Sequence, residues 1–100
     1  MPRRGPVIRV TIYSRPGCHL CDDMKAVVEH VVRATATAAR IEEIDITSDP
    51  QLEARYGLEI PVLLVNGRKA AKYRIAAEDL RRRLMDEAQR SEPQPPTSSL

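Results

Sequence analysis

The hydrophobic pattern of the chain changes its period at Cys18. Before this residue, the stretch VIRVTIY (residues 7–13) is rich in β-branched side chains and alternates between apolar and polar, which predicts a strand. After it, apolar residues recur at steps of three and four and predict one face of a helix: Leu20, Met24, Val27, Val31, Ala34 and Ala38. A strand that leads through a short loop into a helix is a unit of α/β domains.

The next segments continue this alternation. Residues 41–46, IEEIDI, predict a second, short strand. Asp49 or Ser48 can cap a brief helix that has Pro50 at its first position and stops at Gly57. The apolar run IPVLLV (residues 60–65) then predicts a strand that is buried on both faces.

A hairpin and a final helix complete the order. Asn66-Gly67 is a strong two-residue hairpin signal. The following stretch carries Lys69 and Lys72, as an edge strand would. Residues 77–90 predict the last helix. Helices between the first three strands imply crossover connections, and the hairpin adds an antiparallel pair, so we expect a mixed sheet in an α/β domain.

Length and composition predict a single domain. The chain has 100 residues, 42% of them hydrophobic, with no Phe or Trp and three Tyr, so its core must be built from Val, Ile, Leu and Ala. We expect a flexible arm at residues 1–6, the domain at residues 7–90 and a disordered Pro-rich tail at residues 91–100.

Charge and hydropathy exclude several functions. The net charge of +2 is too small to predict binding to nucleic acid. No apolar run approaches the roughly 20 residues of a membrane helix. The basic start resembles an export signal, but its apolar part is broken by Arg9 and alternates like a strand. We therefore expect a cytoplasmic protein, and in that reducing environment a cysteine pair is more often catalytic or metal-binding than structural.

Both cysteines of the chain lie in YSRPGCHLCDD, two residues apart. Cys18 falls where the loop enters the helix, and Cys21 follows one turn later. Unpaired backbone N–H groups and the helix dipole favour a thiolate at this position, so we expect the pKa of Cys18 to lie below the usual value of about 8.5. Cys18 is the candidate nucleophile, and Cys21, which points into the domain, is the candidate resolving cysteine.

Neighbouring charges act in opposite directions on this thiolate. Arg15 and a partly protonated His19 would stabilise it, whereas Asp22 and Asp23 would oppose it. Each of these residues also has a plainer interpretation. Arg15 can be a solvated loop charge, His19 an exposed polar residue and the two acids ordinary first-turn residues of a helix.

Other uses of the cysteine pair remain open. A zinc site needs four ligands, and His30 lies three turns along the same helix, too far to join the pair. We therefore expect no metal site within one chain. Two chains could share a metal or an iron–sulfur cluster through Cys18, and the domain could also be a binding module switched by its redox state.

The segments TIYSRPGCHLC and IPVLLVNG together resemble the glutaredoxin branch of the thioredoxin fold, in particular bacterial glutaredoxin-like proteins with a Cys-His-Leu-Cys centre. The resemblance implies a thioredoxin-like fold of βαβαββα order, with a four-stranded mixed sheet flanked by three helices. It also implies that Pro61 follows a cis peptide bond facing the cysteines. Ile60 would pair its backbone with the substrate. Arg15 would help to hold glutathione, and Tyr13 either packs or contacts the substrate.

The function that follows is that of a monomeric thiol–disulfide oxidoreductase without a resident cofactor. Its partners would be a protein disulfide or a glutathione mixed disulfide, and a reductase or glutathione would recycle it. The chain departs from glutaredoxins where a Gly-Gly pair normally opens the last helix, because Ala76-Ala77 stand near there. Their methyl groups crowd the approach of glutathione, which argues against glutathione as a ligand.

Overall fold

The computed structural model describes residues 7–91. The arm expected at residues 1–6 and the tail from residue 92 onward lie outside the described residues. Four strands, three α-helices and one 3-10 turn follow in the expected order: β1 (Ile8–Ser14), α1 (His19–Thr35), β2 (Ala39–Asp45), the turn η1 (Ile46–Ser48), α2 (Pro50–Tyr56), β3 (Val62–Val65), β4 (Arg68–Lys72) and α3 (Ala77–Ser91). The thioredoxin-like α/β fold is confirmed.

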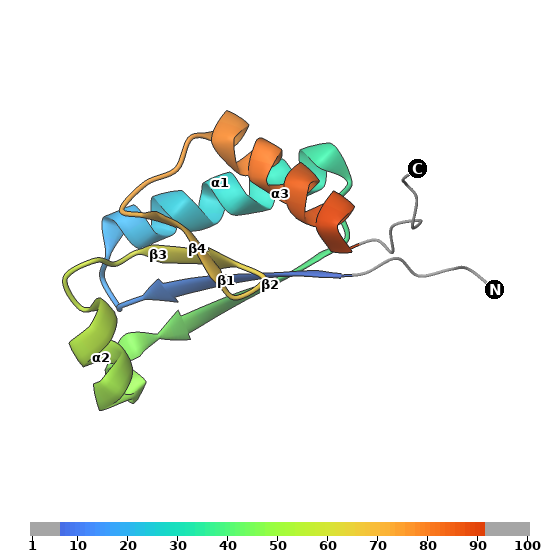
Figure 1. The fold of residues 1–100 in the computed structure, drawn as a ribbon. Coiled ribbons are helices and arrows are strands. Elements are labelled where there is room, and N and C mark those ends of the chain that lie inside the picture. The colour runs from blue at the N-terminus through green and yellow to red at the C-terminus, as the bar shows by residue number, and fades with distance from the viewer. Residues whose placement is uncertain (1–6, 92–100) are drawn as a thin grey trace.

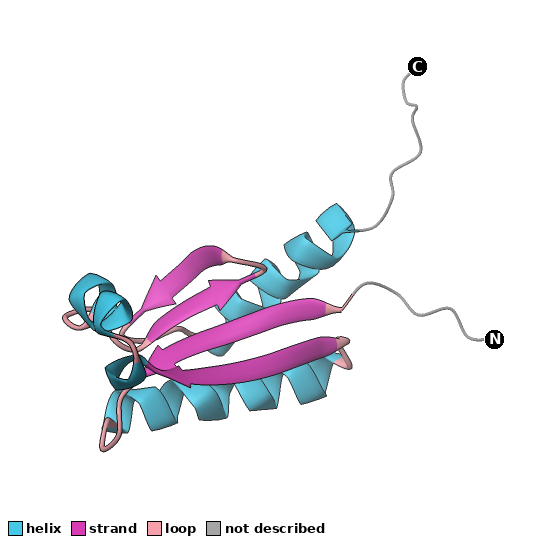
Figure 2. Cartoon of the chain, turned by 90° about the horizontal axis from the view of Figure 1, so that it is seen from below, coloured by secondary structure: helices cyan, strands magenta, loops and turns pink. Residues whose placement is uncertain are grey.

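The four strands form one mixed sheet in the order β2-β1-β3-β4. β1 runs parallel to β2 and antiparallel to β3, and β4 is antiparallel to β3 at the edge. Helices α1 and α3 lie together on one face of the sheet, whereas α2 lies on the other side, beyond the end of β1 (Figure 1). Seen from below, the strands therefore lie in front of α1 and α3 (Figure 2).

The core lies between the sheet and the two helices that share its face. In β1, Ile8, Val10 and Ile12 are buried and alternate with more exposed residues, as a period of two requires. They pack with residues of both helices and of β3: Met24, Val28, Val31, Leu63, Val65, Leu80 and Leu84. All the core side chains are aliphatic or Met, in agreement with the absence of Phe and Trp.

The buried face of α1 differs from the predicted one along the helix. The predicted Leu20 and Val27 are half-buried, and their neighbours Cys21 and Val28 are buried instead. Its buried residues are Cys21, Met24, Val28 and Val31. Ala34 is exposed, and Ala38 lies beyond Thr35, where the helix ends. Ala36 adopts a left-handed conformation with φ 53°, and this C-cap stops the helix before the predicted apolar pattern does.

The hairpin forms as the sequence predicts. Asn66 (φ 51°) and Gly67 (φ 84°) both have positive φ, as a type I′ turn requires. Asn66 also exchanges two hydrogen bonds with the backbone of Arg9 on β1: its N–H donates to the Arg9 carbonyl at 2.8 Å, and its Oδ1 accepts from the Arg9 N–H at 2.9 Å. The turn therefore fixes β3 and β4 against β1.

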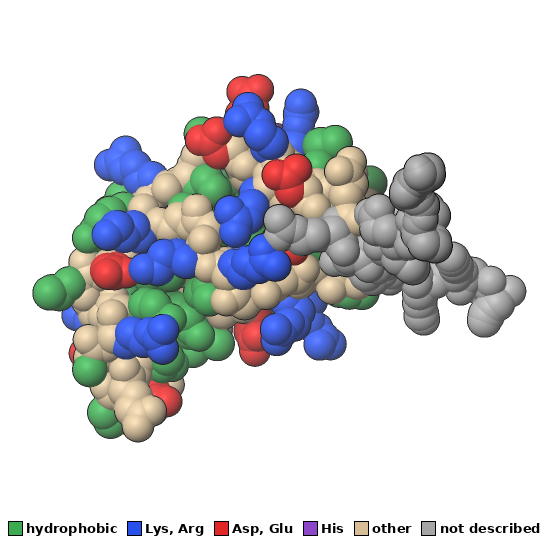
Figure 3. Space-filling model, in the orientation of Figure 1, with side chains coloured by type: hydrophobic (Ala, Val, Ile, Leu, Met, Phe, Trp, Pro, Cys, Tyr) green, Lys and Arg blue, Asp and Glu red, His purple; other side chains and the backbone are tan. Residues whose placement is uncertain are grey.

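The surface carries charges of both signs. Lys and Arg side chains are interspersed with Asp and Glu over the face formed by α3 and β4 (Figure 3). No helix among the described residues is long and apolar enough to cross a membrane.

Candidate redox site

A tight turn brings the chain from β1 into α1. The N–H of Cys18 donates to the carbonyl of Arg15 at 3.3 Å. Pro16 and Gly17 occupy the two central positions, and Gly17 has φ 80°. Pro followed by a residue of positive φ is the pattern of a type II turn, which Gly adopts without strain. The turn places Cys18 at the N-cap of α1.

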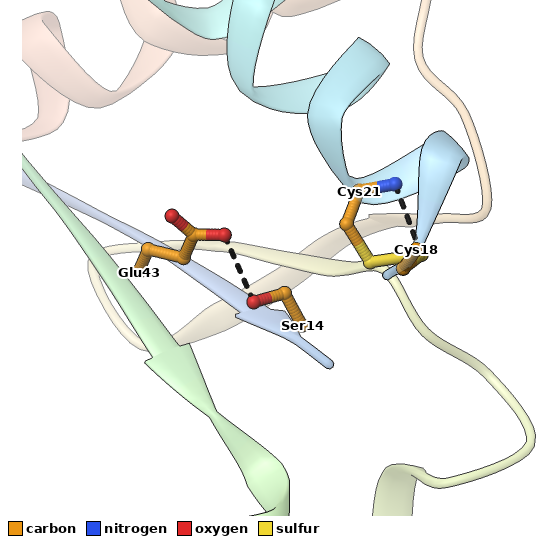
Figure 4. Close-up of a disulfide and its surroundings, with 4 residues drawn as sticks. All are labelled: Ser14, Cys18, Cys21 and Glu43. Carbon is orange, nitrogen blue, oxygen red and sulfur yellow. Dashed lines mark hydrogen bonds between the residues drawn. A yellow bond between two sulfur atoms is a disulfide. The ribbon is translucent and has the colours of Figure 1, made fainter. Parts of the chain in front are cut away.

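The two cysteines form a disulfide across the first turn of this helix (Figure 4), with their Cα atoms 5.2 Å apart. The Cys18 sulfur accepts a hydrogen bond from the backbone N–H of Cys21 at 3.1 Å. Cys18 is partly exposed, whereas Cys21 is 1% exposed. The Cys18 sulfur is therefore accessible from solvent, and it bonds to an N–H group that has no partner within the helix.

A cis peptide bond joins Ile60 to the buried Pro61. In the register of β1 and β3, Tyr13 pairs with Val62, so Pro61 lies beside the end of β1 that leads to the cysteines. Ile60 is half-buried at this position.

Tyr73 braces the segment that precedes the cis bond. Its backbone N–H donates to the Pro61 carbonyl at 2.8 Å, and its phenol donates to the Leu58 carbonyl at 2.9 Å. Lys69 adds an ion pair with Glu59 at 2.8 Å, which lowers the pKa of that carboxyl group. Tyr73 has φ 72°, unusual for a residue other than Gly, so its backbone conformation is strained.

The other candidate residues lie around the cysteines at different places. Arg15 points to α2, where its Nη2 is 3.5 Å from Oε2 of Glu53. Tyr13 stacks on Tyr56 of the same helix, with ring centroids 4.6 Å apart. His19 is exposed in the first turn of α1. The structure therefore joins Cys18 to Cys21 at the start of α1 and places Pro61 beside the end of β1, while Arg15 and Tyr13 face α2.

Sequence reasoning missed a polar cluster beside Cys21. Ser14 is 4% exposed, and its hydroxyl donates to Oε2 of Glu43 at 3.0 Å. Lys25 lies 3.2 Å from Oε1 of the same carboxylate. A signal was present, because Ser14 continues the inward-facing positions of Ile12, and Glu43 continues those of Ile41. Polar residues at core-facing positions of strands are uncommon unless they bond to one another.

An open hollow of about 300 Å³ adjoins this cluster. It is lined by Ser14, Arg15, Pro16, Gly17, Asp22, Glu43 and Asp45. Within residues 7–91, no three His, Cys, Asp or Glu side chains are placed to hold a metal ion.

The fold, the cysteine pair at a helix start and the adjacent cis proline together define a thioredoxin-fold protein with a disulfide-forming Cys-x-x-Cys pair. This geometry indicates a redox function. A family model for the glutaredoxin-like domain (DUF836) matches residues 9–85, and the chain belongs to this family.

Individual relatives agree with this assignment. A protein called thioredoxin from Methanocaldococcus jannaschii is 30% identical over 61 residues, which is 60% of this chain and 72% of that protein. A structural-genomics target from X. campestris is 32% identical, with a TM-score of 0.59 over 77% of this chain and 96% of the other. Chloroplastic thioredoxin z shares the fold at 11% identity, with a TM-score of 0.65 over 84% of this chain and 80% of the other.

Proposed function

We propose that this protein is a dithiol oxidoreductase that reduces disulfide bonds in other proteins, with Cys18 as nucleophile and Cys21 as resolving cysteine. The observation that carries the proposal is the contact between the Cys18 sulfur and the N–H of Cys21 at the start of α1. A donor held there by the helix stabilises negative charge on Cys18 once the disulfide is opened.

The reaction balances with two thiols and one disulfide. The Cys18 thiolate attacks one sulfur of the partner disulfide, and the other sulfur leaves as a thiolate and takes up a proton. The Cys21 thiol then loses its proton and attacks the Cys18 sulfur. The new Cys18–Cys21 bond forms as the second partner sulfur leaves. The partner gains two electrons and two protons, and an external dithiol or reductase must return them to this protein.

The unequal exposure of the two sulfurs supports these roles. A partner disulfide can reach the partly exposed Cys18, whereas Cys21 is 1% exposed and is reached only from within the domain. Ile60 precedes the cis bond, and we propose that its backbone pairs with the extended chain of the partner.

A protein partner fits better than glutathione. Arg15 is paired with Glu53 on α2, so its charge is partly neutralised before any ligand arrives. Ala76 and Ala77 are exposed at the start of α3, where their methyl groups limit the approach of a small anionic peptide to the backbone. A reducing compartment with a disulfide reductase would supply the electrons.

A turnover assay with single cysteine variants tests the proposal. The reduced protein should reduce insulin disulfides in the presence of dithiothreitol. Cys18→Ser should abolish this activity. Cys21→Ser should accumulate a mixed disulfide between Cys18 and the substrate, visible by mass spectrometry as an adduct. Because the chain has two cysteines, the adduct identifies the attacking sulfur without digestion.

Two results would contradict the proposal. Turnover by Cys18→Ser at the wild-type rate would show that this sulfur is not the nucleophile. An adduct on Cys21 in Cys18→Ser, formed as fast as the adduct on Cys18 in Cys21→Ser, would show that the two roles are not distinct. Circular dichroism of both variants checks that the fold is intact.

A further inference from the structure

The end of β4 makes a tight turn of three residues, Lys72, Tyr73 and Arg74, which we call the 72–74 turn. The N–H of Arg74 donates to the carbonyl of Lys72 at 2.8 Å, and Tyr73 between them has φ 72°. A hydrogen bond across one residue of positive φ is the pattern of the rare, strained form of γ-turn. Such a conformation persists only where the surrounding structure enforces it, and it is frequent at ligand-binding sites.

The sheet places this turn beside the segment that carries the cis bond. Lys72 pairs with Val62, the first residue of β3. The N–H of Tyr73 donates to the carbonyl of Pro61 at 2.8 Å. The end of β4 and the start of α1, which carries the cysteines, lie at the same end of the sheet (Figure 1). A partner chain that pairs with Ile60 would therefore meet the 72–74 turn.

The turn presents two positive charges on either side of an aromatic ring. Lys72 and Arg74 are exposed, and neither forms an ion pair within residues 7–91. The ammonium group of Lys72 lies 5.6 Å from the ring centre of Tyr73, which is itself 43% exposed. By contrast, the nearby Lys69 is paired with Glu59 at 2.8 Å. Lys72 and Arg74 are thus available to an approaching anion.

The two edges of the sheet, β2 and β4, differ in charge. Residues 68–87 contain seven Lys and Arg and four Asp and Glu, whereas residues 7–67 contain six and nine. Lys and Arg side chains gather over β4 and α3 (Figure 3). At the β2 edge, the hollow beside the loop before α1 is lined by three acidic residues and one basic residue: Asp22, Glu43, Asp45 and Arg15. An acidic partner segment is therefore complementary to the β4 edge and is repelled from the β2 edge.

We propose that Lys72 and Arg74 select partner proteins in which acidic residues lie next to the disulfide that Cys18 attacks. This inference rests on the proposed oxidoreductase function and names the class of its partner. The acidic side chains of the partner pair with Lys72 and Arg74, while the main chain of the same segment pairs with Ile60. Charges at the rim of an interface act mainly on the rate of encounter and on its salt dependence, so the selection acts on the first exchange step.

Peptides that carry one cysteine in disulfide linkage to 5-thio-2-nitrobenzoate test the proposal. Attack of Cys18 on the peptide sulfur releases the coloured thiolate, whose absorbance gives a second-order rate constant. The peptides differ only in having Glu, Gln or Lys on both sides of their cysteine. Each rate constant is divided by that of dithiothreitol with the same peptide, which removes differences in intrinsic reactivity.

At low salt, we expect the wild-type protein to react about tenfold faster with the Glu peptide than with the Gln peptide, and more slowly with the Lys peptide. The three rates should converge at 1 M salt, where screening acts over about 3 Å. In the double variant Lys72→Glu/Arg74→Glu, the order of the Glu and Lys peptides should be reversed.

The matched control is Arg33→Glu/Arg40→Glu, which changes the net charge by the same amount. Both residues are exposed and lie away from the cysteines, at the last turn of α1 and near the start of β2. This control should keep the wild-type order of peptides. All three proteins should react at similar rates with the uncharged disulfide 2,2′-dithiodipyridine, which shows that Cys18 and the fold are intact.

The wild-type order of peptides in Lys72→Glu/Arg74→Glu would overturn the proposal, and so would wild-type rates that do not change with salt. Stronger inhibition by inorganic phosphate than by chloride at equal ionic strength would also overturn it, because the turn would then be a site for a small anion. A wild-type protein that reacts with dithiodipyridine no faster than Cys18→Ser would instead refute the proposed function itself.

Discussion

The sulfur of Cys18 lies 3.1 Å from the backbone nitrogen of Cys21 and accepts a hydrogen bond from that N–H group. Cys18 is thereby the N-cap of α1. An N-cap normally offers an oxygen to this N–H group. Here a sulfur takes that place, so the side chain that caps the helix is also the side chain that reacts. Helix geometry and thiol chemistry are therefore coupled at a single atom.

This coupling predicts the ionisation of Cys18. In reduced Cys21→Ser, we expect Cys18 to titrate below the usual thiol pKa of about 8.5, because the helix N-terminus stabilises its thiolate. Asp22→Asn should lower this pKa further by removing a nearby negative charge. The ultraviolet absorbance of the thiolate, followed against pH, measures both effects. Titration of Cys18 at the ordinary value would show that the helix start does not activate it.

The hydrogen bond from Tyr73 to the segment before Pro61 predicts a local effect on amide exchange. Tyr73→Phe removes the hydrogen bond to the Leu58 carbonyl, and the loss of one such bond costs about 0.5–1.5 kcal/mol. Amide exchange in residues 58–60 should become faster, while β1 stays protected. Tyr56→Phe, which keeps the ring stacked on Tyr13, is the control. Equal exchange in both variants would mean that the phenol of Tyr73 does not hold this segment.

Asp45, at the turn after β2, predicts that the stability of the fold depends on pH. Hydrogen bonds from the side chain and backbone of Thr47 lower the pKa of Asp45 from its ordinary 3.8. A carboxyl group whose pKa is lower in the folded state stabilises the fold above its unfolded pKa, and this contribution is lost as pH falls through the folded pKa.

We therefore expect Asp45→Asn to unfold at a lower temperature than the wild-type protein at neutral pH. The difference should shrink once the pH falls below about 3.8, the ordinary value for this group. Melting curves over a range of pH values measure it. A difference that stays constant down to the lowest pH would rule out the charge of Asp45 as its source.

Packing between α3 and the sheet predicts a large loss of stability when a buried residue of this helix is shortened. Leu80 is 0% exposed within the core. Leu80→Ala should lower the free energy of unfolding by about 2–5 kcal/mol, through lost burial and the cavity that remains. Met85→Ala on the same helix, at a side chain that is 55% exposed, should cost much less. Urea unfolding of both variants provides the comparison, and equal losses would place Leu80 outside the cooperative core.

Much of the fold could be predicted because its signals are local. The alternation of residues 7–13, the Asn66-Gly67 turn and the cap at Asp49 each specify backbone conformation over a few residues. The buried face of α1 was predicted only in part, because Ala is compatible with exposure as well as burial. Val28 is buried where Val27 was predicted to be, and the helix ends at Thr35, before the predicted Ala38.

The candidate site divides in the same way. The sequence by itself determined that two thiols lie one helical turn apart at the start of a helix, since three-residue spacing and the strand-to-helix change are both written in neighbouring residues. The tertiary structure decided which polar groups accompany them. It directed Arg15 to Glu53 and brought Glu43, 29 residues away in the chain, to Ser14. Pairings of this kind depend on sheet register and helix docking, which no local pattern of residues contains.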